Sequence, residues 1–105
     1  MMKANILGQD YEILYQTEKE NPKLETCNGL CECYSKEIII NKDTQETDGT
    51  YSNFQAWKDK TLRHEIIHAY FQEMGMMEYC NDETLVDLLA HQIPKMIKTF
   101  KELKI

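Results

Sequence analysis

The sequence predicts an α+β domain in which a small antiparallel sheet, formed by the N-terminal half, packs on two helices formed by the C-terminal half. The 105 residues are enough for one domain, which we expect to span 1–105. Short runs rich in Ile, Leu and Tyr occupy the first half, and two long stretches with helical spacing of apolar residues occupy the second. Strands followed by helices in this order are typical of the α+β class.

Four short segments of the first half have the composition of strands. A Gly-Gln-Asp turn signal separates the first two segments, and polar residues bound the others. The expected strands are residues 5–7, 11–16, 31–35 and 36–41. The last segment contains three consecutive isoleucines. It could be an exposed edge strand that pairs with an extended peptide, or a buried central strand.

The first expected helix runs from about residue 52 to residue 74. Ser52 or Asn53 is the candidate N-cap, and Gly75 is the candidate stop. Apolar residues recur at helical spacing and predict a stripe that faces the core. The stripe consists of Leu62, Ile66, Ala69, Tyr70 and Met74.

The second expected helix follows a connector at residues 76–80, starts after Asn81 or Asp82 and ends near Leu103. Pro94 should kink or divide this helix, because proline cannot donate a backbone hydrogen bond. The apolar residues follow an i, i+3, i+4, i+7 pattern. They are Leu85, Leu88, Leu89, Ile93, Met96, Ile97, Phe100 and Leu103.

The chain is acidic, with 12 Lys and Arg residues against 18 Asp and Glu residues and a net charge of −6. This balance argues against a general binder of nucleic acid or anionic membranes, since phosphate neutralisation needs a basic face. The apolar runs are far shorter than the roughly 18 residues that a membrane span needs. No secretory signal is evident either, so we expect a cytoplasmic protein that does not enter membranes.

Four cysteines are present, and in a cytoplasmic chain we expect them to be reduced and partly buried. The spacing Cys27-x₃-Cys31-x-Cys33, together with Cys80, could instead bind a second, structural metal ion. The spacing differs from the usual pairs of cysteines in zinc sites.

Residues 64–68 read His-Glu-Ile-Ile-His, which is the HExxH pattern. On a helix, His64 and His68 lie one turn apart on the same face and can hold one Zn²⁺ ion. Glu65 then lies beside the ion, where a carboxylate can take a proton from a metal-bound water. The alternative is a solvent-exposed face of a polar helix.

A catalytic zinc site needs a third protein ligand, and the second helix offers Glu83 in an E-x-x-x-D pair with Asp87. Asp87 can accept a hydrogen bond from the far ring nitrogen of His64 and thereby fix its orientation. Alternatively, Glu83 is an acid that favours the helix dipole, and Asp87 is a surface residue.

Three further side chains are weaker candidates. His91 lies one turn after Asp87 and could be an oxyanion donor, an alternative ligand or an ordinary helix residue. Tyr79 and Tyr70 could supply a phenol to a tetrahedral intermediate, although Tyr70 fits the core better.

These motifs resemble the gluzincin metallopeptidases, the thermolysin-like zincin class. Arg-His-Glu-Ile-Ile-His-Ala at 63–69, Asn-Asp-Glu at 81–83 and Ala-x-Gln-x-Pro at 90–94 are more closely similar to short phage and prophage gluzincin-like proteins, loosely related to ImmA/IrrE-type metallopeptidases. The resemblance implies His64, His68 and Glu83 as zinc ligands, Glu65 as the catalytic carboxylate and Asp87 as the residue that orients a ligand. It also implies a minimal domain of a sheet plus two helices.

The expected function is therefore a zinc-dependent metallopeptidase that hydrolyses peptide bonds by Glu65-assisted attack of a zinc-bound water. One Zn²⁺ ion is expected, and the expected partner is a protein or peptide substrate, by analogy a regulatory protein. The alternative is a zinc-binding interaction or regulatory protein of phage origin with little or no turnover. A third reading is a structural role without metal.

Overall fold

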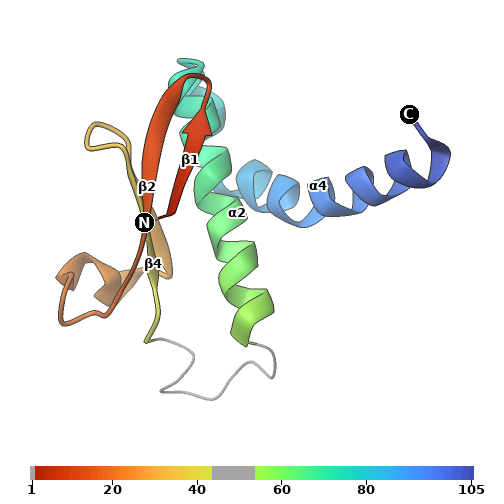
Figure 1. Ribbon diagram of the computed structural model, residues 1–105. Helices are drawn as coiled ribbons and strands as arrows, with labels where there is room; N and C mark the ends of the chain where they lie inside the picture. The colour runs from red at the N-terminus through yellow and green to blue at the C-terminus, as the bar shows by residue number, and fades with distance from the viewer. Residues whose placement is uncertain (1, 44–53) are drawn as a thin grey trace.

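The computed structural model describes residues 2–43 and 54–105. It confirms the α+β class, with the strands in the first half of the chain and the helices in the second (Figure 1). The elements in chain order are β1 (Met2–Ile6), β2 (Gln9–Gln16), the 3-10 helix η1 (Pro22–Thr26), β3 (Gly29–Glu32), β4 (Glu37–Asn41), α2 (Phe54–Glu73), α3 (Met77–Cys80) and α4 (Glu83–Leu103).

The four strands form one sheet in the order β1-β2-β4-β3, and this sheet is mixed rather than purely antiparallel as predicted. The pairs β1–β2 and β3–β4 are antiparallel, whereas β2 and β4 run parallel with Ile13 opposite Ile38. Strand β4 is therefore central, and all three of its isoleucines are buried. Continuous apolar runs are typical of such internal parallel strands. The edge-strand interpretation of residues 36–41 is wrong, because β3 forms that edge.

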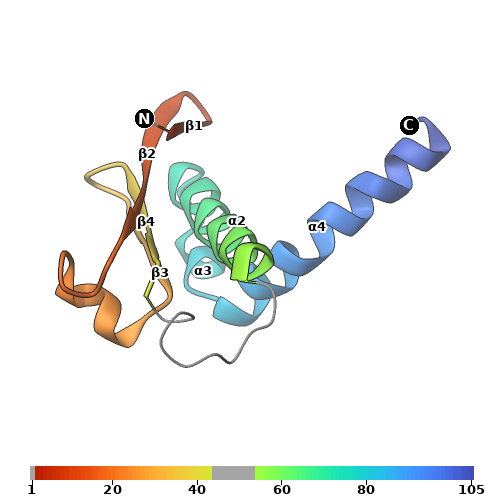
Figure 2. The same ribbon diagram turned by 60° about the horizontal axis from the view of Figure 1, so that its bottom comes forward.

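Helix α2 lies between the sheet and α4, as the two views show (Figures 1 and 2). Two apolar clusters fix it there. The first cluster, between the sheet and α2, consists of Ile6, Tyr11, Ile13, Ile38, Ile40 and Ala69. The second, between α2 and α4, consists of Ile67, Val86 and Ala90, with Phe71 and Leu89 packed against it. Burial on two sides holds the helix that carries the HExxH pattern.

The two-sided packing of α2 corrects the predicted single stripe. Leu62, Ile66 and Ala69 pack in the sheet cluster, whereas Tyr70 and Met74 are 38% and 48% exposed. With 3.6 residues per turn, Tyr70 and Met74 lie between the face toward the sheet and the face toward α4. The expected N-caps Ser52 and Asn53 lie outside the described residues.

The C-terminal end of α2 is a glycine stop, as predicted. Gly75 has a φ of +74°, a left-handed conformation that glycine adopts without a steric penalty. Its N–H bonds the carbonyl of Gln72, and the N–H of Met76 bonds that of Phe71. The expected connector after it contains a single helical turn, α3. Helix α4 then begins as predicted, because the Asp82 side chain accepts a hydrogen bond from the N–H of Leu85.

Helix α4 continues through Pro94 to Leu103, so the proline does not divide it. A proline at this position cannot donate to the carbonyl oxygen of Ala90, four residues earlier. Arg63 of α2 takes that place, donating from Nε to the Ala90 oxygen at 3.0 Å. A side chain from the neighbouring helix thus satisfies the carbonyl that the proline leaves free.

The predicted apolar stripe of α4 is not buried, and only Leu85 and Leu89 of it are partly buried. The residues that α4 buries against α2 are Val86 and Ala90, which the predicted stripe did not include, and the later half of the helix extends away from the rest of the molecule (Figures 1 and 2). Most of the predicted core residues on α4 are consequently exposed, namely Leu88, Ile93, Met96, Ile97, Phe100 and Leu103.

None of the helices in the described part of the chain has both the length and the apolarity that crossing a bilayer requires.

Candidate metal centre

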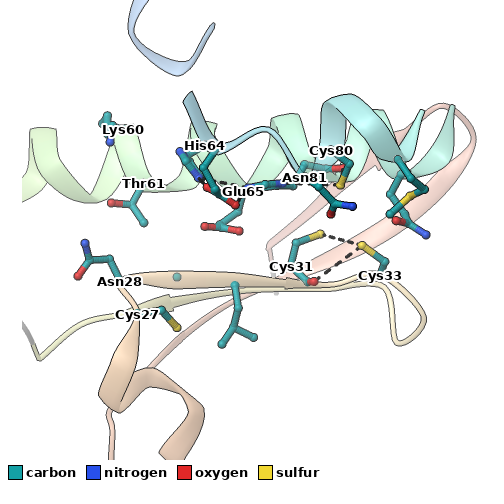
Figure 3. A pocket seen from close by; sticks show the side chains of 16 residues that line it. Cys27, Asn28, Cys31, Cys33, Lys60, Thr61, His64, Glu65, Cys80 and Asn81 are labelled. Atoms are coloured by element: carbon teal, nitrogen blue, oxygen red, sulfur yellow. Dashed lines mark hydrogen bonds and ion pairs between the residues drawn. The ribbon is translucent and has the colours of Figure 1, made fainter. Parts of the chain in front are cut away.

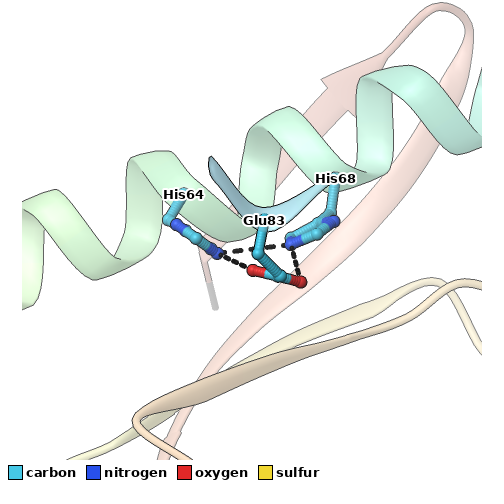
Figure 4. Close-up of side chains that lie close together, drawn as sticks. All are labelled: His64, His68 and Glu83. Carbon is cyan, nitrogen blue, oxygen red and sulfur yellow. Dashed lines mark hydrogen bonds and ion pairs between the residues drawn. The ribbon is translucent and has the colours of Figure 1, made fainter. Parts of the chain in front are cut away.

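Helix α2 and the first turn of α4 bring His64, His68 and Glu83 together (Figure 4). The Nε2 atoms of the two histidines lie 3.2 Å apart. One Glu83 oxygen lies 2.9 Å from Nε2 of His64, and the other lies 3.1 Å from Nε2 of His68. One carboxylate therefore faces both rings.

These three side chains fit the donor set of a zinc site. Zinc binds histidine nitrogen and carboxylate oxygen at roughly 2.0–2.2 Å in tetrahedral geometry, which separates neighbouring ligand atoms by about 3.4 Å. The observed separations are only slightly shorter, so small side-chain rotations would admit an ion. Both histidines are mostly buried, whereas Glu83 is largely exposed, so the site opens toward solvent on the side of α4.

Asp87 fixes the orientation of His64. Its Oδ1 lies 3.2 Å from Nδ1 of His64, and an ionised carboxylate can only accept a hydrogen bond, so Nδ1 carries the proton. In the neutral ring, Nε2 then presents a lone pair toward Glu83. Two electron-rich atoms facing each other at 2.9 Å favour a cation between them.

Lys60, one turn before His64 on α2, holds Asp87 in turn. Its Nζ lies 2.5 Å from Oδ1 of Asp87. The hydrogen bond and charge of Lys60, with a smaller contribution from His64, keep the pKa of Asp87 below its usual range. Asp87 therefore remains an acceptor. Lys60 was not predicted as part of the site, although its i, i+4 spacing from His64 is a signal that could have indicated it.

The corresponding partner of His68 is Cys80, which the sequence analysis did not assign. The Cys80 sulfur lies 3.7 Å from Nδ1 of His68 and 3.5 Å from the backbone oxygen of the same residue. Burial, with smaller contributions from Cys33 and Glu83, raises the pKa of Cys80. A protonated thiol thus packs behind the ring of His68. No spacing rule connects residues 68 and 80, so this contact was not predictable from the sequence.

Glu65 lies beside the metal group and is buried between α2 and the sheet. It is only 7% exposed. Burial and the nearby Glu83 carboxylate raise the pKa of Glu65 to about 8, against the opposing effect of Lys60. A carboxyl group held in this way can accept and release a proton near neutral pH.

A cavity of about 610 Å³ lies between the helices and the sheet (Figure 3). On the helix side, His64, Glu65 and His68 border it. On the sheet side, β3 borders it, and Gly29 allows close approach. A Cβ atom at Gly29 would lie 3.0 Å from Cγ2 of Thr61 and 3.3 Å from Cγ of Glu65. Glycine therefore brings the edge strand directly beside Glu65.

All four cysteines border the same cavity and are free thiols. Cys27, Cys31 and Cys33 are partly buried and Cys80 is buried. Cys31 and Cys33 contact each other, with 3.6 Å between their sulfur atoms. Their position beside the HExxH helix was not predicted, because it depends on the packing of β3 against α2 and not on any spacing in the sequence.

The weaker candidates lie apart from the metal group. His91 is largely exposed, and its Nε2 lies 3.6 Å from Oδ2 of Asp87. Tyr79 packs against the ring of Phe71, with 5.8 Å between ring centroids, and is 43% exposed. Neither His91, Tyr79 nor Tyr70 borders the cavity described above.

Comparisons of the chain with protein-family models, with curated proteins and with solved structures give no match. The resemblance to phage gluzincin-like proteins therefore stays a prediction.

Proposed function

We propose that this protein is a zinc-dependent metallopeptidase that hydrolyses peptide bonds. The observation that carries the proposal is the convergence of His64, His68 and Glu83 beside the buried carboxyl group of Glu65. Two histidines and one carboxylate leave a fourth tetrahedral position open, which is typical of catalytic rather than structural zinc sites. The free thiols favour a reducing compartment, so we also propose a cytoplasmic location.

Each residue has a distinct role in the proposed reaction. His64, His68 and Glu83 would hold the ion, with His64 oriented by Asp87 and His68 by Cys80. When bound, zinc would lower the pKa of water and polarise the substrate carbonyl. Glu65 accepts the proton of the attacking water and returns it to the leaving amine.

Strand β3 supports a peptide as the substrate class. It is one of the two edge strands of the sheet, so one side of its backbone is not paired within the sheet. Residues 29–31 of β3 also border the cavity that contains Glu65. An extended peptide that pairs with this edge would lie between β3 and the metal group. The substrate amide would then be within reach of Glu65.

One observation favours a second candidate, a zinc-binding interaction or regulatory protein with little turnover. Among the described residues that border the cavity, the only histidines are the two proposed ligands, and no tyrosine is present. Donors to a developing oxyanion would instead come from other groups that border the cavity, such as Lys60, Asn28 and Asn81. Such a site could retain zinc for stability or for binding a partner.

Cleavage of a quenched-fluorescent peptide library by the zinc-loaded protein separates the two candidates. We expect cleavage that a chelator abolishes and added zinc restores. Glu65→Gln should retain one zinc ion per chain and lose activity by about 10²–10⁴-fold, the usual contribution of a general base. Full activity in Glu65→Gln would contradict the mechanism. Stoichiometric zinc without cleavage of any peptide would favour the second candidate.

Metal analysis tests the ligand set independently of activity. We expect His68→Ala and Glu83→Ala to lose tightly bound zinc. Glu102→Gln, which removes an exposed acid from the same helix as Glu83, is the matched control and should bind zinc as the wild type does. Unchanged zinc affinity in Glu83→Ala would contradict the proposed site.

A further inference from the structure

The cavity has a second chemically distinct feature, the pair of thiols on its sheet side (Figure 3). Cys31 is part of β3, and Cys33 follows directly after the strand. Their sulfur atoms lie 3.6 Å apart, and the Cys33 thiol also points to the backbone oxygen of Cys31 at 3.8 Å. A disulfide bond is about 2.04 Å long, so the sulfur atoms need to approach by only about 1.6 Å.

We propose that Cys31 and Cys33 are a redox modification site, at which small disulfide oxidants such as oxidised glutathione form a reversible intramolecular disulfide. The proposal does not depend on the proposed peptidase activity. It adds a covalent reaction on the wall of the cavity opposite His68.

The other two thiols are directed elsewhere, which makes the pair specific. Cys27 points to the backbone oxygen of Lys23 at 3.3 Å. Cys80 is buried against His68 and contacts its ring and backbone. Among the four cysteines, all of which lie in the described part of the chain, only Cys31 and Cys33 have a direct sulfur–sulfur contact.

The pair is also accessible to a small reagent. Both residues are partly buried rather than fully buried, and both border the cavity of about 610 Å³. That cavity gives a small disulfide reagent a route to both sulfur atoms, whereas Cys80 is only 7% exposed. Among the four cysteines, Cys31 and Cys33 are therefore the only two whose sulfur atoms are in contact and also partly exposed to the cavity.

The reaction proceeds by two thiol–disulfide exchanges. The Cys33 thiolate attacks oxidised glutathione, forms a mixed disulfide and releases one glutathione thiol. Cys31 then attacks the Cys33 sulfur, forms the protein disulfide and releases the second glutathione thiol. The two cysteines lose two electrons and two protons, and glutathione disulfide gains them. We write Cys33 as the first nucleophile because burial and the neighbouring Cys33 thiol raise the pKa of Cys31.

The test uses the full chain, with and without zinc, in buffers of graded ratio of reduced to oxidised glutathione. Free thiols are alkylated, disulfides are reduced, and the released thiols are alkylated with a second reagent. Trypsin then yields the peptide Leu-Glu-Thr-Cys-Asn-Gly-Leu-Cys-Glu-Cys-Tyr-Ser-Lys, residues 24–36, which contains three of the four cysteines. Its fragment masses show which thiols were oxidised.

We expect the second label on Cys31 and Cys33 together, the first label on Cys27 and Cys80, and full reversal by dithiothreitol. In Cys31→Ser, Cys33 has no resolving thiol, so mixed glutathione disulfide on Cys33 should accumulate at least about tenfold more than in the wild type, because intramolecular resolution is lost. Cys27→Ser is the matched control and should still form the pair.

Several results would overturn the proposal. They are a disulfide that includes Cys27 or Cys80, a stable mixed disulfide on the wild-type protein, or four thiols that stay reduced in fully oxidised glutathione. Since the readout is thiol labelling, these results leave the peptidase proposal unaffected. Conversely, loss of zinc binding or of cleavage in the tests above leaves this proposal unaffected.

Discussion

Arg63 donates a hydrogen bond from Nε to the carbonyl oxygen of Ala90 at 3.0 Å, and this oxygen is the one that Pro94 leaves without a helical donor. Ala90 is completely buried, so an unpaired carbonyl there would be costly. The contact joins α2 to α4 at the residue immediately before His64. It therefore helps to set the position of α4, and with it Glu83, relative to the histidines.

A double-mutant cycle tests this contact. Arg63→Gln should lower the free energy of unfolding by about 1–3 kcal/mol, because it leaves a buried acceptor unpaired. In a Pro94→Ala background the residue at 94 regains its N–H and can bond the Ala90 oxygen, so the same substitution should cost clearly less. Urea unfolding measures all four proteins, and Lys95→Gln is the control on the exposed side of α4. Equal costs in both backgrounds would show that Arg63 does not stabilise the protein through the carbonyl oxygen that Pro94 leaves free.

Asp87→Asn should weaken zinc binding by about 10–100-fold, the usual effect of removing a carboxylate that orients a liganding histidine. The neutral amide no longer fixes the proton on Nδ1 of His64. His91→Gln removes the other ring that contacts Asp87 and should change zinc affinity little, because His91 is exposed and lies outside the metal group. Competition with a chromophoric chelator gives both affinities. Similar losses in the two variants would place His91 in the site.

Gly29→Ala should destabilise the protein by about 1–3 kcal/mol, because the new Cβ would meet Cγ2 of Thr61 at 3.0 Å and the backbone oxygen of Ile39 at 3.2 Å. Thr61→Ser removes Cγ2, so the double variant should recover part of the loss. Thermal unfolding of the single and double variants measures this recovery. If Gly29→Ala were as stable as the wild type, β3 and α2 would not be in close contact.

Glu73 should contribute to stability only above acidic pH. The ion pair with Lys36, and then the hydrogen bond from buried Tyr11, lower the pKa of Glu73. A lowered pKa in the folded state means that this contribution is present above the usual carboxyl pKa and is lost as the pH falls through the folded value. Glu73→Gln should therefore destabilise the protein at neutral pH and have less effect below about pH 4. Urea unfolding at both pH values measures this. An equal effect at both would mean that the carboxylate charge is not involved.

Much of the site could be predicted because its chemistry depends on local spacing. His64 and His68 lie on one face of α2, and Glu83 and Asp87 lie on one face of α4. The i, i+4 spacing in the sequence therefore indicates each pair. The three isoleucines of β4 also indicated a central strand, which was one of two interpretations. In each case the signal lies within a few residues of chain.

The remaining features arise from contacts between distant segments. Cys80 meets His68, and Gly29 meets Thr61, only because α3 and β3 fold against α2. Periodicity also indicated apolar faces without indicating what covers them. Tyr70, Met74 and the later residues of α4 therefore fit a helical stripe and are nevertheless exposed.

The proposed ligands come from two helices that share only a small apolar contact, around Ile67, Val86 and Ala90. If zinc binds there, ion occupancy and attachment of α4 would be one linked equilibrium. Each tenfold rise of free zinc above its dissociation constant would add about 1.4 kcal/mol to that attachment. Amide hydrogen exchange in the first turns of α4 should accordingly slow as zinc is added. The local stability of this helix would then depend on the concentration of free zinc.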